Sequence, residues 1–335
     1  MTETTPPFDG LTPDRVISAV ESLGLICDLR ITALNSYENR VYQVGIDGEL
    51  PIIAKFYRPA RWSDAQILEE HAFSAELQAL EIPAISPLSY PVNSVNGEGK
   101  TLHLFEGFRF SLYPRVGGGA PEFDNPDHLN MIGRTLGRLH LAGVQRPFEY
   151  RQTLSIERFA CESIDFLLSH DFLPPELRQS YETLTADLLI RMRNRWEMAG
   201  QFAWLRTHGD CHVGNILWRN DTPFLVDFDD CMMAPAVQDL WLFLSGTREE
   251  MQMQLSELLD GYGDFMDFNP AELHLVEVMR TLRIIHYSAW LARRWNDPAF
   301  PHHFPWFNTG RYWAEHILEL REQLAALDEP ALRIF

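Results

Sequence analysis

The chain has 335 residues, of which 46% are hydrophobic and 22% are charged. This composition is typical of one large or two modest globular domains with a buried core. The chain carries 28 basic and 47 acidic residues, which gives a net charge of −19. We therefore expect no nucleic-acid partner, because proteins that bind polyanions use clustered lysine and arginine side chains to displace counterions.

The four cysteines and the N-terminal residues indicate in which cellular compartment the protein is expected. The cysteines are scattered without a C-x-x-C spacing, which argues against a disulfide framework and against a zinc ribbon. The first residues, MTETTPPFDG, contain neither the basic nor the apolar segment of a signal peptide. Because no apolar run is long enough to cross a bilayer, we expect a cytoplasmic protein without a membrane partner.

The first third of the chain predicts mixed β-structure. Pro13 suits an early helical position, where its missing N–H has no cost, and Ser63 suits an N-cap before apolar residues at helical spacing. Elsewhere, alternating β-branched and aromatic residues favour antiparallel strands. The predicted elements are a helix over 12–23, strands within 29–46 and 50–59, a helix over 63–80 and a hairpin over 100–116.

After the glycine run at 117–119, which we interpret as a hinge, the pattern changes to helices. The predicted elements are a helix over 126–143, long helices within 155–200, short strands near 216–218 and 223–226, and four helices after 235 with a loop around 296–306. We therefore predict an α+β fold with a small β-rich lobe over residues 1–115 and a larger helical lobe over residues 116–335.

Polar residues lie close together in the stretch RTHGDCHVGNILW, which covers residues 206–218. His208, Asp210, His212 and Asn215 fall within it, and Asp227 follows at the end of the strand-like stretch TPFLV. Three interpretations compete for these residues. They are metal ligands, parts of a phosphoryl-transfer site, or the polar contents of an ordinary turn.

The pattern H-G-D-x-H-x-x-N with a later D-F-D favours phosphoryl transfer, a reaction that needs positioning and charge neutralisation. Asp210 would orient and deprotonate the attacking hydroxyl, and Asn215 and Asp227 would supply the oxygen ligands that Mg²⁺ prefers. The catalytic loop of protein kinases has the same interval between its Asp and its Asn, and its metal-binding Asp also follows a strand. Asp210 and Asp227 are therefore the predicted catalytic residues.

A metal hydrolase is the alternative from another class of enzyme. His208 and His212 are four residues apart, and the aspartates of the D-F-D-D stretch could complete a two-metal site. Zinc-binding histidine pairs at this interval usually lie on a helix, whereas two glycines within the motif favour a loop. We prefer a structural role in the turn for His212 and a supporting role for His208.

A kinase also needs a cation near the nucleotide's phosphates, and Lys55 is the candidate. It lies among apolar residues of the predicted strand LPIIAKFYRP, where an ammonium group is costly without a partner. The next predicted helix offers Glu69 and Glu70. Glu70 lies three residues before Phe73 on the apolar stripe, so we predict that Glu70 pairs with Lys55. The alternative is a lysine on an edge strand that points to water.

The phosphates also need donors from a loop, but the G-x-G-x-x-G of protein kinases is absent. In its place the stretch LNSYENRVY offers Asn35, Ser36 and Asn39 between two predicted strands. We predict that Ser36 contacts the phosphates, with a plain turn serine as the alternative. The backbone of residues 113–116 would suit the adenine edge.

These motifs resemble a known group of enzymes. HGDCHVGNILW together with VDFDD resembles the aminoglycoside phosphotransferase and choline kinase superfamily, which has a protein-kinase-like fold. NSYENRVYQ, KFYRPARW, ILEEH, PAVQDLW, AWLARRW and DPAFPHHFPW narrow the resemblance to the bacterial stress response kinases, which are serine/threonine protein kinases. The resemblance extends over roughly residues 10–325.

The resemblance implies a two-lobed protein-kinase-like fold and a role for each matching residue. Asp210 would be the proton acceptor, Asn215 and Asp227 the magnesium ligands, and Ser36 an ATP contact, with Lys55 as the strand lysine. The resemblance further implies ATP as the phosphoryl donor, a cytoplasmic monomer that phosphorylates itself, and a part in protection from oxidative and other lethal stress.

Two departures from ordinary protein kinases concern regulation and the acceptor. Asp227 is followed by Phe228 and Asp229, so there is no D-F-G, and only eleven residues separate Asp227 from Asp239. Control through a long activation loop is therefore not expected.

In small-molecule kinases of the superfamily the C-terminal helices form the acceptor pocket. The corresponding candidates here are Trp290, Arg293, Arg294, Trp295 and Trp306, and the alternative is an aromatic core whose arginines extend to solvent.

We interpret the chain as an ATP-dependent kinase that acts on hydroxyl groups. The first choice is a serine/threonine protein kinase, by resemblance. The alternative is a small-molecule kinase whose acceptor is of the homoserine, choline or aminoglycoside type. A third interpretation is a nucleotide-binding module without catalysis, but such a chain would usually lack one of Asp210, Asn215 and Asp227.

Overall fold

The computed structural model describes residues 6–91, 99–122 and 124–334. The chain forms two compact units, and each of them is made of three separate segments of the sequence. Unit 1 comprises Met1–Pro121, Glu149–Arg151 and Gly214–Asp230, and unit 2 comprises Glu122–Phe148, Gln152–Val213 and Cys231–Phe335. A single cut in the chain does not separate the units, because residues 214–230 belong with the N-terminal part.

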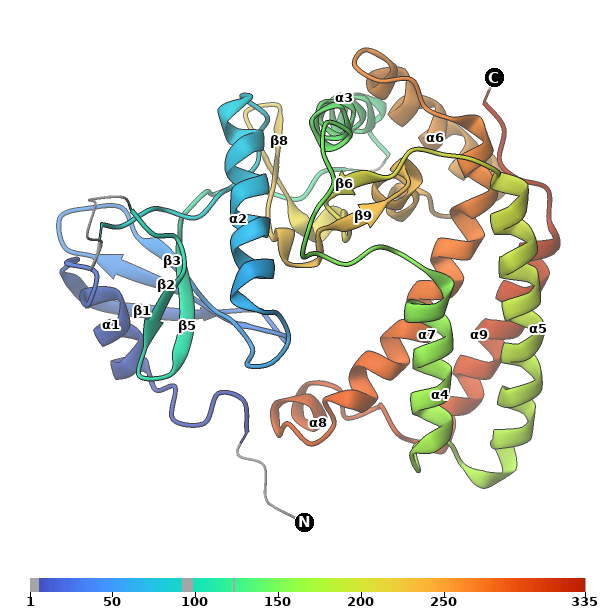
Figure 1. Cartoon of the computed structure of the whole chain (residues 1–335), viewed down its shortest axis with the longest axis horizontal. Coiled ribbons are helices and arrows are strands. Elements are labelled where there is room, and N and C mark those ends of the chain that lie inside the picture. Colours follow the sequence, from blue (N-terminus) through green and yellow to red (C-terminus); the bar gives the residue numbers. More distant parts are fainter. Residues whose placement is uncertain (1–5, 92–98, 123, 335) are drawn as a thin grey trace. The chain divides into compact units, whose positions relative to one another are not determined.

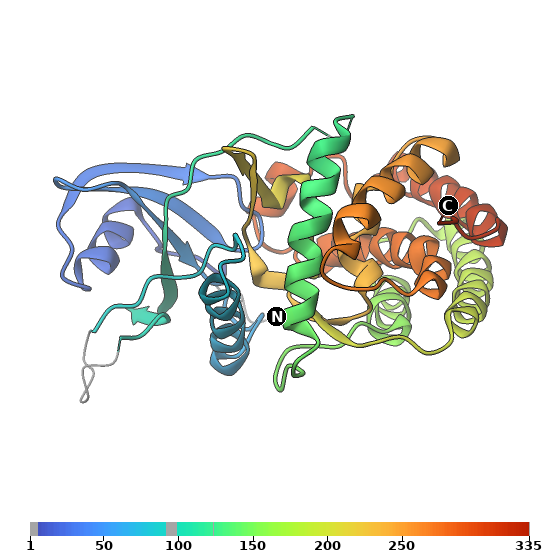
Figure 2. The same cartoon turned by 90° about the horizontal axis from the view of Figure 1, so that it is seen from above.

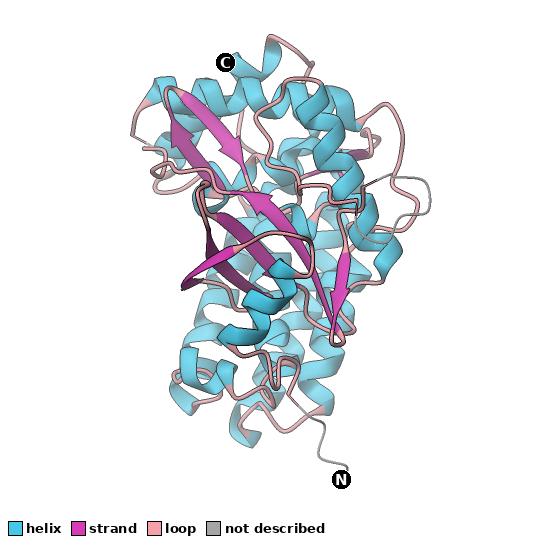
Figure 3. Ribbon diagram, turned by 90° about the vertical axis from the view of Figure 1, so that its left-hand side faces the viewer, coloured by secondary structure: helices cyan, strands magenta, loops and turns pink. Residues whose placement is uncertain are grey.

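Unit 1 is built on a five-stranded antiparallel sheet in the order β1-β2-β3-β5-β4, drawn as magenta arrows in Figure 3. The strands are β1 (Cys27–Leu34), β2 (Arg40–Ile46), β3 (Ile52–Phe56), β4 (His103–Phe105) and β5 (Phe108–Pro114). β3 is a central strand, with β2 on one side and β5 on the other. Lys55 is therefore carried by a strand that is paired on both edges.

Two helices complete the N-terminal part of unit 1, α1 (Pro13–Glu21) and α2 (Asp64–Ala79) (Figure 1). The apolar side of α1, with Val16 and Val20, packs with strand residues such as Val44 in one core cluster. α2 begins with a capping box, in which the Ser63 hydroxyl accepts from the Gln66 N–H and the Gln66 side chain accepts from the Ser63 N–H. Such a cap contributes about 1 kcal/mol and fixes where the helix starts.

A two-stranded hairpin, β7 (Ile216–Arg219) and β8 (Thr222–Leu225), returns to unit 1. The two residues of its turn, Asn220 and Asp221, both have positive φ, at 50° and 54°. A two-residue turn of this kind matches the right-handed twist of the strands, and Asn and Asp tolerate it well. Leu225 also pairs with Ala84, so the hairpin is fixed against the segment that follows α2.

Unit 2 is mainly helical, and its helices α4, α5, α7 and α9 run side by side (Figure 1). The helices are α3 (Pro126–Gly143), α4 (Glu162–Ser169), α5 (Pro175–Ala199), α6 (Arg248–Gly263), α7 (Val276–Arg293), α8 (Ala299–His303) and α9 (Gly310–Asp328). Its two strands, β6 (Leu205–Thr207) and β9 (Met232–Ala234), pair with each other. Its shorter turns are a π-helical turn at Glu157–Cys161 and 3₁₀ turns at Ala236–Asp239, Trp241–Phe243 and Pro270–Leu275. Of the remaining 3₁₀ turns in the described residues, Val213–Asn215 begins at the last residue of a unit 2 segment, and Phe228–Asp230 belongs to unit 1.

α3, the green helix seen from the side in Figure 2, packs closely on α6. Glycines make this approach possible, because a methyl group on Gly133 would overlap the Leu258 carbonyl oxygen. A methyl group on Gly261 would likewise overlap the Asn130 carbonyl oxygen. The backbones of the two helices therefore touch at these positions.

The predicted helices and strands occur close to their expected positions, with two differences. The loop expected around 296–306 contains the short helix α8, and the β6–β9 pair was not predicted. Strands of three residues are too short to show an alternating pattern, so only tertiary pairing reveals them. Within the described ranges, the helices are all too short or too polar to span a membrane.

Candidate active site

The predicted site residues fall in both units. Asn215 and Asp227 belong to unit 1 and flank the open end of the β7–β8 hairpin. The Val226 N–H donates to the Asn215 carbonyl at 3.0 Å, one step beyond the Ile216–Leu225 pair. The hairpin register therefore brings the residue before β7 and the residues after β8 to the same end.

Asp227 presents its carboxylate to solvent. Its φ is 60°, in the left-handed region that Asp adopts more readily than most residues, and its side chain is 53% exposed. Residues held in this conformation cluster at functional sites. A carboxylate and an amide oxygen at one end of a hairpin are donors that suit a hard divalent cation such as Mg²⁺.

Lys55 is buried and lies among three carboxylates of unit 1. Its Nζ is 2.8 Å from Asp227 Oδ1, 3.2 Å from Asp229 Oδ1 and 3.9 Å from Glu70 Oε1. Burial alone would lower the pKa of the ammonium, but these carboxylates hold its pKa well above the usual value. Lys55 is therefore charged, and it does not point to water from a sheet edge.

The two adjacent glutamates of α2 have different partners. Glu70 is buried and faces Lys55, and burial raises the pKa of its carboxyl group because Lys55 offsets only part of the desolvation. The Glu69 carboxylate accepts from the backbone N–H groups of Glu149, Tyr150 and Arg151 at 2.5, 2.9 and 2.7 Å. Glu69 thus fixes residues 149–151 to α2 and is not oriented toward Lys55.

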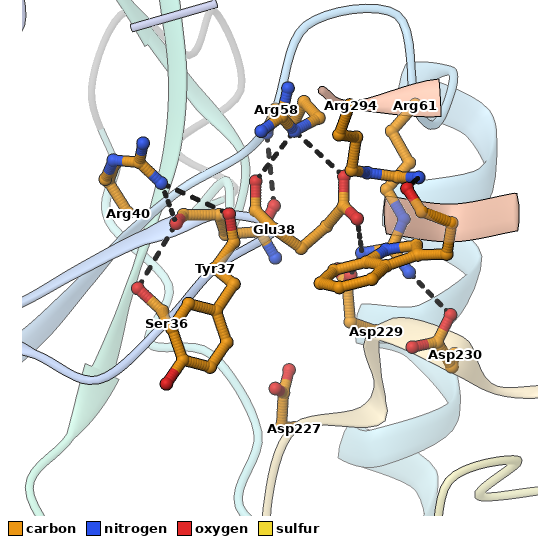
Figure 4. A network of polar contacts seen from close by, with 12 residues as sticks. Ser36, Tyr37, Glu38, Arg40, Arg58, Arg61, Asp227, Asp229, Asp230 and Arg294 are labelled. Carbon is orange, nitrogen blue, oxygen red and sulfur yellow. Dashed lines mark hydrogen bonds and ion pairs between the residues drawn. The ribbon is translucent and has the colours of Figure 1, made fainter. Parts of the chain in front are cut away.

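Asp229, the last acidic residue of the D-F-D motif, is buried and ionised. Arg61 contacts its Oδ2 and also donates to Asp230 Oδ1 at 2.6 Å, as Figure 4 shows. Burial would raise the pKa of Asp229, but the charges of Arg61 and Lys55 hold that pKa well below its usual range. Sequence reasoning had not assigned a role to Arg61.

Ser36 lies in the turn between β1 and β2, with its hydroxyl bonded within the turn. Its Oγ donates to the Asn39 carbonyl at 3.2 Å and accepts from the Val41 N–H at 3.2 Å. The Asn39 side chain accepts from the Arg58 N–H at 3.1 Å. These bonds give the turn a defined shape, and whether Ser36 contacts a phosphate stays a prediction.

Asp210 belongs to unit 2, where Arg283 and His212 contact its carboxylate. Its Oδ1 is 2.5 Å from Nη1 of Arg283 on α7, and its Oδ2 is 3.4 Å from Nε2 of His212. Burial would raise the pKa of Asp210, but the hydrogen bond from His212 and the charge of Arg283 hold that pKa well below its usual range. The carboxylate is therefore ionised and able to accept a proton.

Backbone bonds to one buried carboxylate fix the loop that carries Asp210. Asp239 accepts from the N–H groups of His208 and Gly209 at 2.7 and 2.8 Å. Its Oδ2 is also 3.0 Å from Nε2 of His140 on α3. The His208 backbone thus supports the turn, as predicted from the motif. In the portion of the chain that the structure describes, no group of three or more His, Cys, Asp or Glu side chains could hold a metal ion.

Most of the predicted acceptor residues pack against other aromatic or aliphatic groups of unit 2. Trp290 packs edge-on to Phe300, Arg294 lies over the Trp290 ring, and Arg293 lies over Phe166. The packing of Trp290 matches the aromatic core of the alternative interpretation. Arg293 is exposed, as that interpretation expects, whereas Arg294 is half-buried. Trp306 is 45% exposed, and an acceptor role for these residues stays a prediction.

The comparisons with known proteins agree with these motifs. The model of the phosphotransferase enzyme family matches residues 30–276. The chain is 40% identical over 327 residues to a protein of Salmonella typhimurium named serine/threonine protein kinase RdoA, covering 98% of this chain and 97% of the relative. The same identity and coverage relate it to stress response kinase A of Escherichia coli. The resemblance predicted from the motifs is confirmed.

Solved structures confirm the predicted α+β, protein-kinase-like fold. An amicoumacin kinase in complex with AMP-PNP, Ca²⁺ and Ami matches with a TM-score of 0.72 at 19% identity, over 96% of this chain and 95% of that one. A choline kinase from Cryptosporidium parvum matches with a TM-score of 0.58 at 14% identity, over 93% and 95% of the two chains. The chain therefore belongs to the phosphotransferase enzyme family and is a kinase.

Proposed function

We propose that this kinase transfers the γ-phosphoryl group of ATP to serine or threonine hydroxyls of proteins, and that this activity helps to protect the cell against stress. The transfer chemistry is supported by the ionised Asp210, with Arg283 and His212 on its two oxygens. The protein acceptor and the stress role are supported by the names of the two relatives, each 40% identical over 98% of the chain. We further propose that the protein is a cytoplasmic monomer that phosphorylates itself.

In this proposal Asp210 is the catalytic base. Its carboxylate would accept a hydrogen bond from the acceptor hydroxyl, orient the hydroxyl oxygen for attack on the γ-phosphorus, and take the proton as the new P–O bond forms. The bond between the γ-phosphorus and the bridging oxygen breaks, and ADP leaves with that oxygen. The short bond from Arg283 keeps the carboxylate ionised before the acceptor arrives.

On the nucleotide side, Asn215 and Asp227 would hold Mg²⁺, which neutralises charge on the β- and γ-phosphates when bound. Asp227 is exposed and Asn215 is partly exposed, so both side chains are accessible to a metal–nucleotide complex. Lys55 would bind phosphate oxygens while Glu70 holds its ammonium in place, and Ser36 would contact the phosphates from the β1–β2 turn.

A small-molecule alcohol is the alternative acceptor. Only eleven residues separate Asp227 from Asp239, so the chain has no long activation segment to bind a peptide as in protein kinases. One of the similar folds is an aminopropanol kinase, with a TM-score of 0.67 at 18% identity. The relatives' names favour a protein acceptor over this alternative.

The test uses ATP labelled at the γ-phosphate with Mg²⁺. Wild type and Asp227→Ala are incubated alone, with a generic basic protein, and with a panel of amino alcohols and aminoglycosides. We expect label on serine or threonine of protein with wild type and none with Asp227→Ala, because the metal loses its carboxylate ligand. Label on a small alcohol with all proteins blank would overturn the proposed acceptor, and label transferred equally by Asp227→Ala would overturn the assignment of the metal site.

A further inference from the structure

The Lys55 ammonium lies beside a carboxylate, that of Asp229, which a D-F-G motif would lack. This carboxylate competes with the nucleotide's phosphates for the charge of Lys55. The carboxylate of Asp229, at the position of the D-F-G glycine, is buried and lies 3.2 Å from the Lys55 ammonium. Asp227, the predicted metal ligand, lies 2.8 Å from the same ammonium, but its carboxylate is half exposed and can be solvated. A buried carboxylate cannot rely on water, so it needs a cation within hydrogen-bond distance.

Arg61 provides this second cation. Its side chain is only 14% exposed, contacts Asp229 Oδ2 and lies 2.6 Å from Asp230 Oδ1 (Figure 4). Its guanidinium also lies over the ring of Trp62, 5.2 Å from the centroid. A planar guanidinium with two donors can bind two carboxylates at once, which a lysine ammonium does less well. Asp229 is thus bound on one oxygen by Lys55 and on the other by Arg61.

We propose that Arg61 is a positioning residue that neutralises Asp229 and thereby leaves the Lys55 ammonium available to the nucleotide's phosphates. The charge of Arg151 also stabilises the Asp229 carboxylate, and Arg151 donates to the Asp229 backbone carbonyl. Without Arg61, the buried carboxylate would depend more on Lys55, and moving the Lys55 ammonium to a phosphate would remove a large part of its charge compensation. Arg61 and Asp229 would therefore act as a pair. This inference rests on the proposed role of Lys55, but not on the identity of the acceptor.

Arg61 has one further neighbour that suggests a competing explanation. Its Nη1 lies 3.9 Å from Glu38 Oε2, in the turn that carries Ser36, while Arg58 Nε lies 2.9 Å from Glu38 Oε1. If Arg61 acted by holding this turn, its loss would be harmful whatever residue stood at position 229. The two explanations therefore differ in what a change at Asp229 does.

The test measures equilibrium binding of a fluorescent ATP analogue in Mg²⁺ to the full chain. Arg61→Gln should weaken binding by about tenfold or more, because a charge-assisted bond from Lys55 to the phosphates is lost. Arg61→Gln combined with Asp229→Asn should restore the affinity to within about threefold of wild type, since no buried carboxylate then retains Lys55. Arg61→Lys should lie between wild type and Arg61→Gln and serves if the glutamine variant folds poorly.

Arg109→Gln is the matched control, because Arg109 binds the same segment without touching Asp229. Its Nη1 donates to the Trp62 carbonyl and to Asp64, both at 2.8 Å, and we expect its loss to leave nucleotide affinity unchanged. Normal affinity in Arg61→Gln, or a double variant as weak as the single one, would overturn the proposal. This binding assay contains no acceptor. If the acceptor proves to be a small molecule, the proposed function is overturned, but the result of the binding assay is not affected.

Discussion

Asp210 shows how two side chains set the properties of one carboxylate. Arg283 comes from α7, 73 residues along the chain, and binds Asp210 Oδ1, whereas His212 comes from the same loop. Both stabilise the ionised form against the burial that opposes it. The base is thereby ready at neutral pH, at the expense of some proton affinity.

Removing Arg283 should change the pH dependence of catalysis. In Arg283→Leu the pKa of Asp210 should rise, because the charge and the hydrogen bond of Arg283 no longer oppose the effect of burial. A base is active above its pKa, so the acidic limb of kcat/KM should move to higher pH, while activity on the alkaline side is less affected. Initial rates of phosphoryl transfer between pH 4 and 8 measure this.

Arg280→Leu is the control on the same helix. Arg280 pairs with Glu277 and lies over Trp241, without contact to Asp210. We expect its pH profile to match wild type. An acidic limb in Arg283→Leu that coincides with wild type would show that Arg283 does not set the pKa of Asp210.

At this scale the sequence predicted the residues with local motifs and, for Lys55, the partner Glu70, but it did not predict the arginine partners of the aspartates. Asp210, Asn215 and Asp227 were recognisable because their intervals are short, and Lys55 because a charge among apolar strand residues is costly without a partner. Arg61 binds Asp229 across 168 residues and Arg283 binds Asp210 across 73. No spacing rule connects such pairs, and each arginine alone resembles an ordinary surface residue.

At the scale of elements, the α3–α6 contact makes a prediction about glycine. Gly133→Ala should destabilise the protein by about 1–3 kcal/mol, because a methyl group would meet the Leu258 backbone and separate the helices. This cost exceeds the gain of roughly 1 kcal/mol that alanine brings to a helix interior. Urea denaturation followed by circular dichroism gives the difference.

Gly263→Ala provides the comparison near the end of α6. Gly263 is the last residue of α6, its φ is not positive, and nothing lies within 4 Å of an added methyl group. There the helix propensity should dominate, so we expect a neutral or slightly stabilising effect of less than about 1 kcal/mol. Equal effects at the two positions would contradict the close contact at Gly133.

The helices and longer strands were predictable because each satisfies several local rules at once. The N-cap residue Ser63 and the apolar stripe of α2 both predict that the helix begins after Ser63. The turn residues Asn220 and Asp221 favour a hairpin. The β6–β9 pair has no such local signature. It depends on residues 205–207 and 232–234 meeting in the folded unit.

At the scale of the whole molecule, a buried glutamate should make stability depend on pH. Burial raises the pKa of Glu272 from 4.5 to about 7. Because this pKa is higher in the folded chain than in the unfolded chain, its contribution is fully present below pH 4.5 and is lost as pH rises toward 7. Relative to Glu272→Gln, wild type should therefore lose roughly 3 kcal/mol of unfolding free energy over this range.

The measurement is urea denaturation of both proteins at several pH values between 4.5 and 7.5. The Glu272 carboxylate accepts from the Val237 N–H at 3.0 Å, a bond that a glutamine carbonyl can keep. The difference between the two proteins should grow in favour of Glu272→Gln as pH rises. A difference that does not vary with pH would mean that Glu272 titrates normally in the folded chain.

The central claim is that Asp210 is the base of a phosphoryl transfer, and single-turnover kinetics of Asp210→Asn test it most directly. With labelled ATP, Mg²⁺ and the acceptor found in the first assay, the variant should bind nucleotide like wild type. Its transfer rate should fall by roughly 10²–10⁴, because the hydroxyl proton has no acceptor. A transfer rate equal to that of wild type would contradict the role of Asp210 and require another base.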